Sequence, residues 1–204
     1  MSIIPSVKNS LNFDEINQII TANYSVFTKE YTTFLSEWLT DTNKIFGDSD
    51  KFYILIYIFN KNLEFYNNNL IEFDFDTFNK TAQFDIQKIN IVDISKNLNI
   101  AKETTRRKII ELQKDGIIKR TKKEIIIDKS SFVLFDINNT LKSLSNLLFK
   151  LYNIFLDEGI ISKKITRDEI YNLLKKKFSF IMYRYFEFII PWTTNWKTRL
   201  QVKS

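Results

Sequence analysis

The chain has 204 residues and a formal net charge of +6, and it contains neither Cys nor His. Their absence excludes thiol catalysis, disulfide bonds, Cys/His zinc sites and histidine-based acid–base chemistry. Three Gly and two Pro are few for this length, so we expect long helices. The longest apolar run, 52–59, is far below the roughly 20 residues of a membrane span. The N-terminus MSIIPSVKNS has no signal-peptide pattern. We expect a soluble, cytoplasmic protein without membrane contact.

The N-terminal part predicts a flexible arm over 1–12 and a short helix over 13–23. An amphipathic helix over 28–46 is indicated by apolar side chains at helical spacing, namely Tyr31, Phe34, Leu35, Trp38, Leu39 and Phe46. The run 47–50, Gly-Asp-Ser-Asp, breaks this pattern and offers N-cap residues for the next helix. That helix, over 50–67, is apolar on most sides and is expected to be buried.

The segment 70–85 has an acidic pattern, because Glu72, Asp74 and Asp76 alternate with Phe73 and Phe75. This alternation fits an edge strand or an extended loop. An alternating Asp-x-Asp pair can also bind a divalent metal beside a sugar nucleotide. No Gly-rich phosphate loop and no third carboxylate accompany it, so a solvated acidic loop is the favoured interpretation.

The stretch 89–128 predicts a helical corner followed by a hairpin. A helix over 91–98 ends at Asn99, a residue type that tolerates left-handed backbone. A second helix over 101–114 ends before Gly116, a C-cap glycine. Short strands over 117–120 and 124–128 follow. The side chains expected to bury this corner against a third helix are Ile94, Leu98, Ile100, Thr105, Ile109, Leu112 and Ile118.

Basic residues concentrate in the same stretch. From Ser95 to Lys123 there are ten basic and three acidic residues, a net charge of +7, so the rest of the chain sums to −1. Such a concentration is typical of a surface that meets phosphates.

The order of core residues in this stretch is distinctive: Ile94-Ser95, Leu98, Asn99-Ile100, Thr104-Thr105, Arg107, Ile109, Leu112, Gly116 and Ile118. It resembles the winged helix-turn-helix of bacterial transcription regulators, in the segment shared by the MarR, CRP and GntR families. The chain departs from that pattern at Asn99, where those families usually have Gly, and at Thr105, where they usually have Val. It also has a short wing without the Asp-x-Arg feature of typical MarR proteins.

The resemblance covers about forty residues and implies a mainly α fold. In this fold a winged helix-turn-helix, made of three helices and a short β-hairpin wing, is flanked by N- and C-terminal helices. We divide the chain into an N-terminal arm and helix (1–47), a winged DNA-binding module (48–129) and a C-terminal helical region (130–204).

A long helix is predicted after the wing, capped by Ser130 and Ser131 and reaching residue 158. Its heptad seam consists of Leu134, Ile137, Leu141, Leu144, Leu148, Leu151 and Phe155. This seam has two interpretations, packing within one chain or a dimer contact, and the dimer is slightly favoured.

A last helix is predicted over 166–190. Thr166 and Glu169 have the spacing of a capping box, and Pro191 is expected to block continuation. The lysines of 175–177 are more typical of a solvated face than of a binding site.

The function predicted from these patterns is sequence-specific binding of double-stranded DNA by a non-enzymatic transcription regulator without a cofactor. The helix over 101–114 would enter the major groove, and the basic wing over 119–123 would contact the backbone or the minor groove. The resemblance makes Arg107 the best candidate for a base contact. The expected DNA-binding residues are Lys96, Lys102, Glu103, Thr104, Arg106, Arg107, Lys108, Lys119, Arg120, Lys122 and Lys123.

The MarR-like layout implies a homodimer through helices 28–46, 131–158 and 166–190, with recognition helices about 34–36 Å apart on a pseudo-palindromic site. A small aromatic effector among the aromatic residues of 178–196 is possible by the same resemblance, although such a stripe is more often core. Two alternatives stay open. One is a plasmid- or phage-type replication initiator that uses the same winged helix, and the other is an enzyme that uses Asp74 and Asp76.

Overall fold

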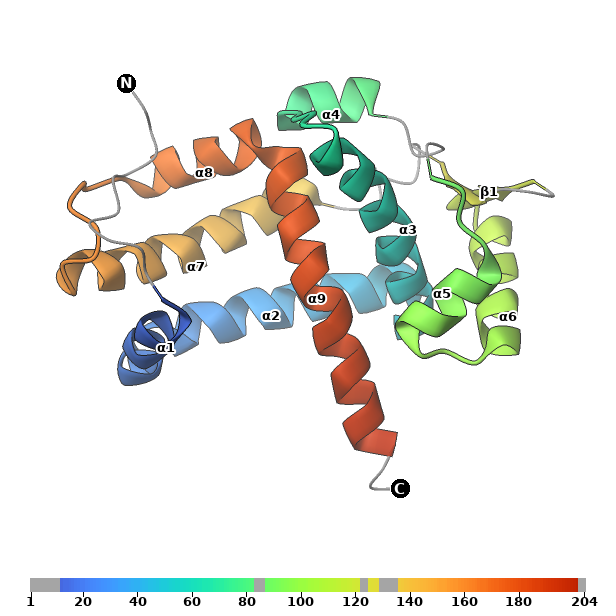
Figure 1. Cartoon of the computed structure of the whole chain (residues 1–204), viewed down its shortest axis with the longest axis horizontal. Coiled ribbons are helices and arrows are strands. Elements are labelled where there is room, and N and C mark those ends of the chain that lie inside the picture. Colours follow the sequence, from blue (N-terminus) through green and yellow to red (C-terminus); the bar gives the residue numbers. More distant parts are fainter. Residues whose placement is uncertain (1–11, 83–86, 122–124, 129–135, 202–204) are drawn as a thin grey trace. The chain divides into compact units, whose positions relative to one another are not determined.

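The computed structural model describes residues 12–82, 87–121, 125–128 and 136–201, with side chains as far as Trp192. Within these ranges the protein is mainly helical, as expected, and has one small antiparallel sheet of two strands (Figure 1). In the same ranges, no helix has both the length and the apolar character needed to cross a membrane. The elements are α1 (Phe13–Ala22), α2 (Tyr24–Phe46), α3 (Ser49–Asn68), α4 (Phe75–Thr81), α5 (Ile91–Leu98), α6 (Lys102–Lys114), β1 (Ile118–Arg120), β2 (Ile125–Ile127), α7 (Ile137–Asp157), α8 (Arg167–Lys176) and α9 (Phe178–Gln201).

The described residues form two compact units. One contains 12–40 and 136–174, that is α1, most of α2, α7 and most of α8. The other contains 41–128 and 175–201, that is α3 to α6, the two strands and α9. We name them the α7 unit and the α3 unit after their central helices.

Helix α3 is the core of the α3 unit. Every side chain from Ile54 to Phe59 is buried, and six consecutive residues cover all directions around a helix. The helix packs against α9, α6, α5 and β2. The expected buried central helix is therefore confirmed, and its N-cap is Asp48, whose carboxylate accepts hydrogen bonds from the N–H groups of Asp50 and Lys51.

The turn between α5 and α6 is a sharp corner at Asn99, which has left-handed backbone angles of φ 51° and ψ 42°. Ser95 donates its hydroxyl hydrogen bond to the carbonyl of Ile100 at 2.7 Å. Thr105 is fully buried, and its hydroxyl donates to the carbonyl of Ala101 at 3.1 Å. The hydroxyl of Thr105, at a position where an apolar side chain would be usual, is thus satisfied by the backbone of its own helix.

The C-terminus of α6 is closed by Gly116, which has a φ of 72°. The N–H of Ile117 donates to the carbonyl of Leu112, and the N–H of Gly116 to that of Gln113, which is a Schellman-type closure. The hairpin follows directly, with Ile118 opposite Ile127. Its isoleucines Ile118, Ile125 and Ile127 are buried. The predicted corner and hairpin are confirmed, with α6 beginning one residue later and the strands slightly shorter than expected.

The acidic segment after α3 contains a helix from Phe75 to Thr81, so both the edge strand and the favoured solvated loop are wrong for that part. Asp74 caps α4, because its carboxylate accepts a hydrogen bond from the N–H of Thr77 at 2.7 Å. Phe75 and Phe78 lie on one side of the helix, and both rings contact Phe178 of α9. The three-residue spacing of Phe75 and Phe78 places both rings on one side of a helix. This spacing, and not the two-residue alternation of the carboxylates, therefore corresponds to the secondary structure of the segment.

The single helix expected over 166–190 is two helices, separated at Lys177. The capping box at Thr166 and Glu169 is confirmed, with both reciprocal hydrogen bonds formed. The break follows from a long-range contact, because Ser179 exchanges hydrogen bonds with the backbone of Phe73. This contact fixes the start of α9 beside α4.

Pro191 does not end α9, which continues to Gln201. A proline inside a helix removes one hydrogen bond and costs about 3 kcal/mol. The preceding turns are held by packing, since Tyr183, Phe186 and Ile189 are buried and α9 lies along α3. The packing of α9 against α3 therefore more than offsets the cost of Pro191, and the helix continues through this residue. Of the aromatic residues of α9, Phe178, Tyr183 and Phe186 belong to the core, whereas Phe180 and Phe188 are exposed.

In the α7 unit, α2 and α7 run antiparallel. Asn23 bonds to Glu158 near one end, and Ser143 bonds to Glu37 near the other. Helix α8 is likewise antiparallel to α7, since Arg167 bonds to Asn146 and Tyr171 to Asn138. Helix α7 begins at Ile137 after its N-cap Asp136, so the prediction that Ser130 and Ser131 cap a helix starting at 131 is wrong. Helix α2 begins at Tyr24, four residues earlier than expected. The arm over 1–11, Ser130, Ser131 and Leu134 lie outside the described residues.

The left-handed corner gives a stability prediction. Replacing Asn99 by Ala should lower the free energy of unfolding by about 1 kcal/mol, whereas Asn99→Gly should change it by no more than about 0.5 kcal/mol. At Asn97, inside α5, the order should reverse, because Gly is about 1 kcal/mol worse than Ala in a helix. Urea denaturation of the four variants measures this. The same order at both positions would contradict a left-handed residue at the corner.

Candidate functional site

Helix α6 has one buried and one exposed side. Thr105, Ile109 and Leu112 are fully buried. On the opposite side lies a stripe with a spacing of three or four residues, which we call the outer stripe: Glu103, Arg107, Ile110 and Lys114. All four are exposed, and Ile110 is a large apolar residue with 41% of its surface accessible. No described element packs extensively on this side, since the main partners of α6 are α3, α5 and β1.

The arginines of α6 are exposed and only loosely paired. The side chain of Arg107 is 67% exposed, and its Nε lies 3.8 Å from Glu111. Arg106 is 51% exposed and lies 4.0 Å from Glu103. Lys102 is exposed at the start of the helix, and Thr104 is half-buried beside it. Both guanidinium groups are therefore accessible from solvent.

The other predicted binding residues lie around this helix. Lys96 is exposed at the end of α5, and Arg120 is exposed at the end of β1. Lys119 is 73% exposed and forms an ion pair with Asp128 at 2.8 Å. Lys122 and Lys123, the tip of the predicted wing, lie outside the described residues.

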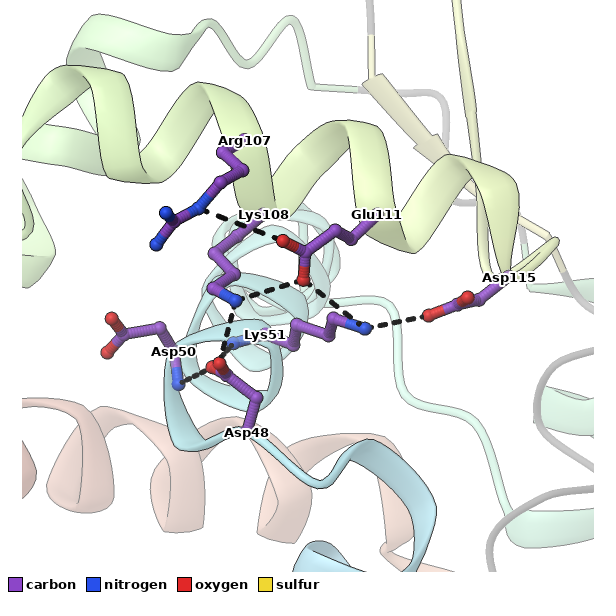
Figure 2. A network of polar contacts seen from close by, with 7 residues as sticks. All are labelled: Asp48, Asp50, Lys51, Arg107, Lys108, Glu111 and Asp115. Carbon is purple, nitrogen blue, oxygen red and sulfur yellow. Dashed lines mark hydrogen bonds and ion pairs between the residues drawn. The ribbon is translucent and has the colours of Figure 1, made fainter.

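Lys108 has a different environment, because it points toward the N-terminus of α3 (Figure 2). Its Nζ lies 2.8 Å from Asp48 and 2.9 Å from Glu111, and its side chain is 12% exposed. Glu111 also accepts from Lys51 at 3.5 Å, and Lys51 reaches Asp115 at 3.0 Å. We call these five residues the α3–α6 ion network. It joins the last two turns of α6, from Lys108 to the C-cap Asp115, to the N-cap and first turn of α3.

The pKa values of four network residues, Asp48, Lys51, Lys108 and Glu111, shift in the directions that favour their charged forms. Hydrogen bonds to Asp48 and Glu111 raise the pKa of Lys108, and the bond to Asp115 raises that of Lys51. Burial raises the pKa of Asp48, but bonds from Lys108 and from backbone N–H groups outweigh burial and lower it overall. The bond from Lys108 lowers the pKa of Glu111. These four side chains are therefore charged at neutral pH.

Sequence reasoning grouped Lys108 with the exposed cations, and it did not single out Ile110 or Lys114. The helical spacing from Arg107 to Ile110 and Lys114 could have revealed the outer stripe. Helical spacing could have revealed Glu111, three residues away, as one partner of Lys108. Nothing local could have revealed Asp48, since it lies at the N-terminus of α3 and far away in the sequence.

The acidic pair Asp74 and Asp76 has a structural role at Asp74, which caps α4. Hydrogen bonds from Thr77 lower the pKa of this carboxyl group. Among the described residues, no group of three or more carboxylates is placed to hold a metal ion.

Comparison with known proteins returned no matching family model, no matching curated protein and no matching solved structure.

The ion network predicts a pH dependence. Because the folded pKa values of Asp48 and Glu111 are lowered, their stabilising effect is present above about pH 4 and is lost as pH falls through the folded values. Replacing Lys108 by Met should lower the free energy of unfolding at pH 7 by about 1 kcal/mol. It should also flatten the decline of stability between about pH 5 and pH 3.

Urea denaturation across this pH range measures both effects. Lys102→Met is the matched control, because Lys102 is an exposed lysine of the same helix without an ion pair to Asp48. If Lys108→Met and Lys102→Met give the same pH profile, the network does not contribute to acid sensitivity.

Proposed function

We propose that the protein is a sequence-specific, non-enzymatic regulator of transcription that binds double-stranded DNA through a winged helix-turn-helix. In this assignment α3, α5 and α6 are its three helices, α6 is the recognition helix, and β1 and β2 belong to the wing. One observation carries the proposal. The side of α6 opposite its buried face is exposed and rich in cations, while the corner behind it is tightly packed.

Base recognition would come from the outer stripe. The guanidinium of Arg107 can pair with both major-groove acceptors of guanine, and the carboxylate of Glu103 can accept from cytosine. Both side chains are exposed and are one helical turn apart. They could therefore address neighbouring base pairs.

Phosphate contacts would come from the cations around the stripe. Lys96, Lys102, Arg106 and Arg120 are exposed on α5, α6 and β1. Such contacts fix the position of a protein on the duplex but do not distinguish sequences. Lys108 would act indirectly, since it holds α6 against α3 rather than pointing to solvent.

Selection of bound duplexes from a random pool is the experiment that tests the proposal. We expect enrichment of a defined site, with an affinity that falls steeply as salt rises. A pseudo-palindromic site would agree with a dimeric regulator, whereas tandem repeats would favour a replication initiator. No salt-sensitive binding to any duplex would refute the proposal.

A substitution at Arg107 tests the base contact. Arg107→Ala should weaken binding to the selected site by about 1–3 kcal/mol and relax sequence preference at one position. Arg120→Gln should weaken binding to all duplexes alike and reduce the salt slope by about one. Fluorescence anisotropy titrations at several salt concentrations measure both. Lys80→Ala, an exposed lysine of α4, is the control; an effect equal to that of Arg107→Ala would mean that only total charge matters.

We also propose a homodimer formed through the terminal helices. Along α7, Leu141 is buried, but the seam residues Leu144, Leu148, Leu151 and Phe155 remain partly exposed. A partner helix could complete their burial.

Leu148→Glu should convert a dimer to a monomer, because it would place a charge in the apolar seam. Light scattering coupled to size-exclusion chromatography measures the mass, and Lys142→Glu, at an exposed position of α7, is the control. A monomeric wild-type protein at micromolar concentration would contradict the dimer.

A further inference from the structure

A polar groove lies between α2 and α7 in the α7 unit, where the two helices run antiparallel. Its volume is about 480 Å³, within the range of small-ligand sites. Three elements line it: α2, α7 and the first residue of α8. The lining residues are Lys29, Glu30, Thr33, Ser143, Asn146, Phe149, Lys150 and Arg167.

The groove contains more positive charge than its own carboxylate neutralises. Lys29, Lys150 and Arg167 line the groove together with a single acid, Glu30. In the part of the chain that the structure describes, none of these three cations forms an ion pair. Arg167 is instead oriented by Asn146, whose amide oxygen accepts from its Nη1 at 3.1 Å. The groove is therefore an electropositive recess rather than a salt-bridged contact.

Glu30 has an unsatisfied acceptor. Its Oε2 is buried and has no hydrogen-bond partner among the described residues. A buried polar atom without a partner is costly, and in native proteins it usually marks a place for water or a ligand. Because this oxygen has almost no accessible surface, a hydroxyl or amine donor of a ligand would reach it only once the Glu30 side chain turns toward the groove that it lines.

These features together define a ligand class. We propose that the groove binds a small phosphate monoester that carries hydroxyl groups, such as a nucleotide or a sugar phosphate. The cations would pair with the doubly charged phosphate, as lysine and arginine do. Glu30 would accept from a hydroxyl group. Phe149 would supply an apolar wall for the organic part. The groove belongs to the α7 unit alone, so this assignment does not depend on DNA binding.

Calorimetric titration of the full chain with AMP, inorganic phosphate and adenosine tests the proposal. We expect saturable binding of AMP with a Kd below about 1 mM, weaker binding of inorganic phosphate and none of adenosine. The double variant Lys150→Gln/Arg167→Gln should weaken AMP binding at least about tenfold. Lys163→Gln/Lys164→Gln removes the same charge from exposed positions before α8 and should leave binding unchanged.

Glu30→Gln separates recognition of the organic part from attraction of the phosphate. It should weaken AMP binding about fivefold or more, because a charged carboxylate is a stronger hydrogen-bond acceptor than the amide that replaces it. It should leave phosphate binding equal or tighter, because a negative charge is removed. Circular dichroism and the thermal midpoint show whether each variant is folded.

Three outcomes would overturn the assignment. They are absence of saturable binding to AMP, an equal loss in the two double variants, and parallel effects of Glu30→Gln on AMP and phosphate. A duplex titration separates the two sources of phosphate. If the groove variants weaken duplex binding while AMP does not bind, the groove is a nucleic-acid surface and not a metabolite site.

Discussion

The burial of α3 on all its sides is the constraint on which the α3 unit depends. A helix whose residues 54–59 are all buried must be surrounded by other elements, because apolar surface left in water is unfavourable. Helices α5, α6 and α9 and strand β2 provide that cover. Each of them has apolar side chains on the face turned to α3. Apart from Lys108 and Glu111, which reach the start of α3, the charged residues of α6 face outward. The exposure of the cations of α6 is thus a consequence of how the core is filled.

Hydrophobic packing alone only weakly determines how a helix is rotated about its own axis. The ion network adds contacts that determine this rotation for α6. Lys108 can reach Asp48 and Glu111 together only when one side of α6 faces the first turn of α3. Asp48 is at the same time the N-cap of α3, so the start of one helix and the rotation of the other are set by one carboxylate. With α6 rotated in this way, Arg107 and Lys114 point outward. Loss of the network would therefore change the direction in which the outer stripe points, although no residue of the stripe belongs to the network.

The sequence was sufficient where structure depends on neighbours within a few residues. The bounds of α3 and α5, the left-handed Asn99 and the closing Gly116 follow from caps, turns and helical spacing, and the structure confirms each. The sequence was insufficient where distant residues decide. The break between α8 and α9 depends on the contact of Ser179 with Phe73, and the inward direction of Lys108 depends on Asp48. Helical periodicity describes neighbours within a few residues, so it cannot predict contacts between residues that are far apart in the sequence.

The net charge of a segment is consequently a poor measure of what its surface offers. Lys108 counts toward the positive total of 95–123, yet it is held between two carboxylates and is nearly buried. Lys29, Lys150 and Arg167 lie outside that segment, in a part of the chain whose total is close to neutral, and they share a recess with a single acid. A cationic side chain attracts an anionic ligand strongly only if neighbouring carboxylates do not already neutralise its charge. The ligand must also be able to displace the water around that cation. By that criterion the α2–α7 groove and the outer stripe of α6 are both candidate sites for anions, although only the cations around α6 form a visible cluster in the sequence.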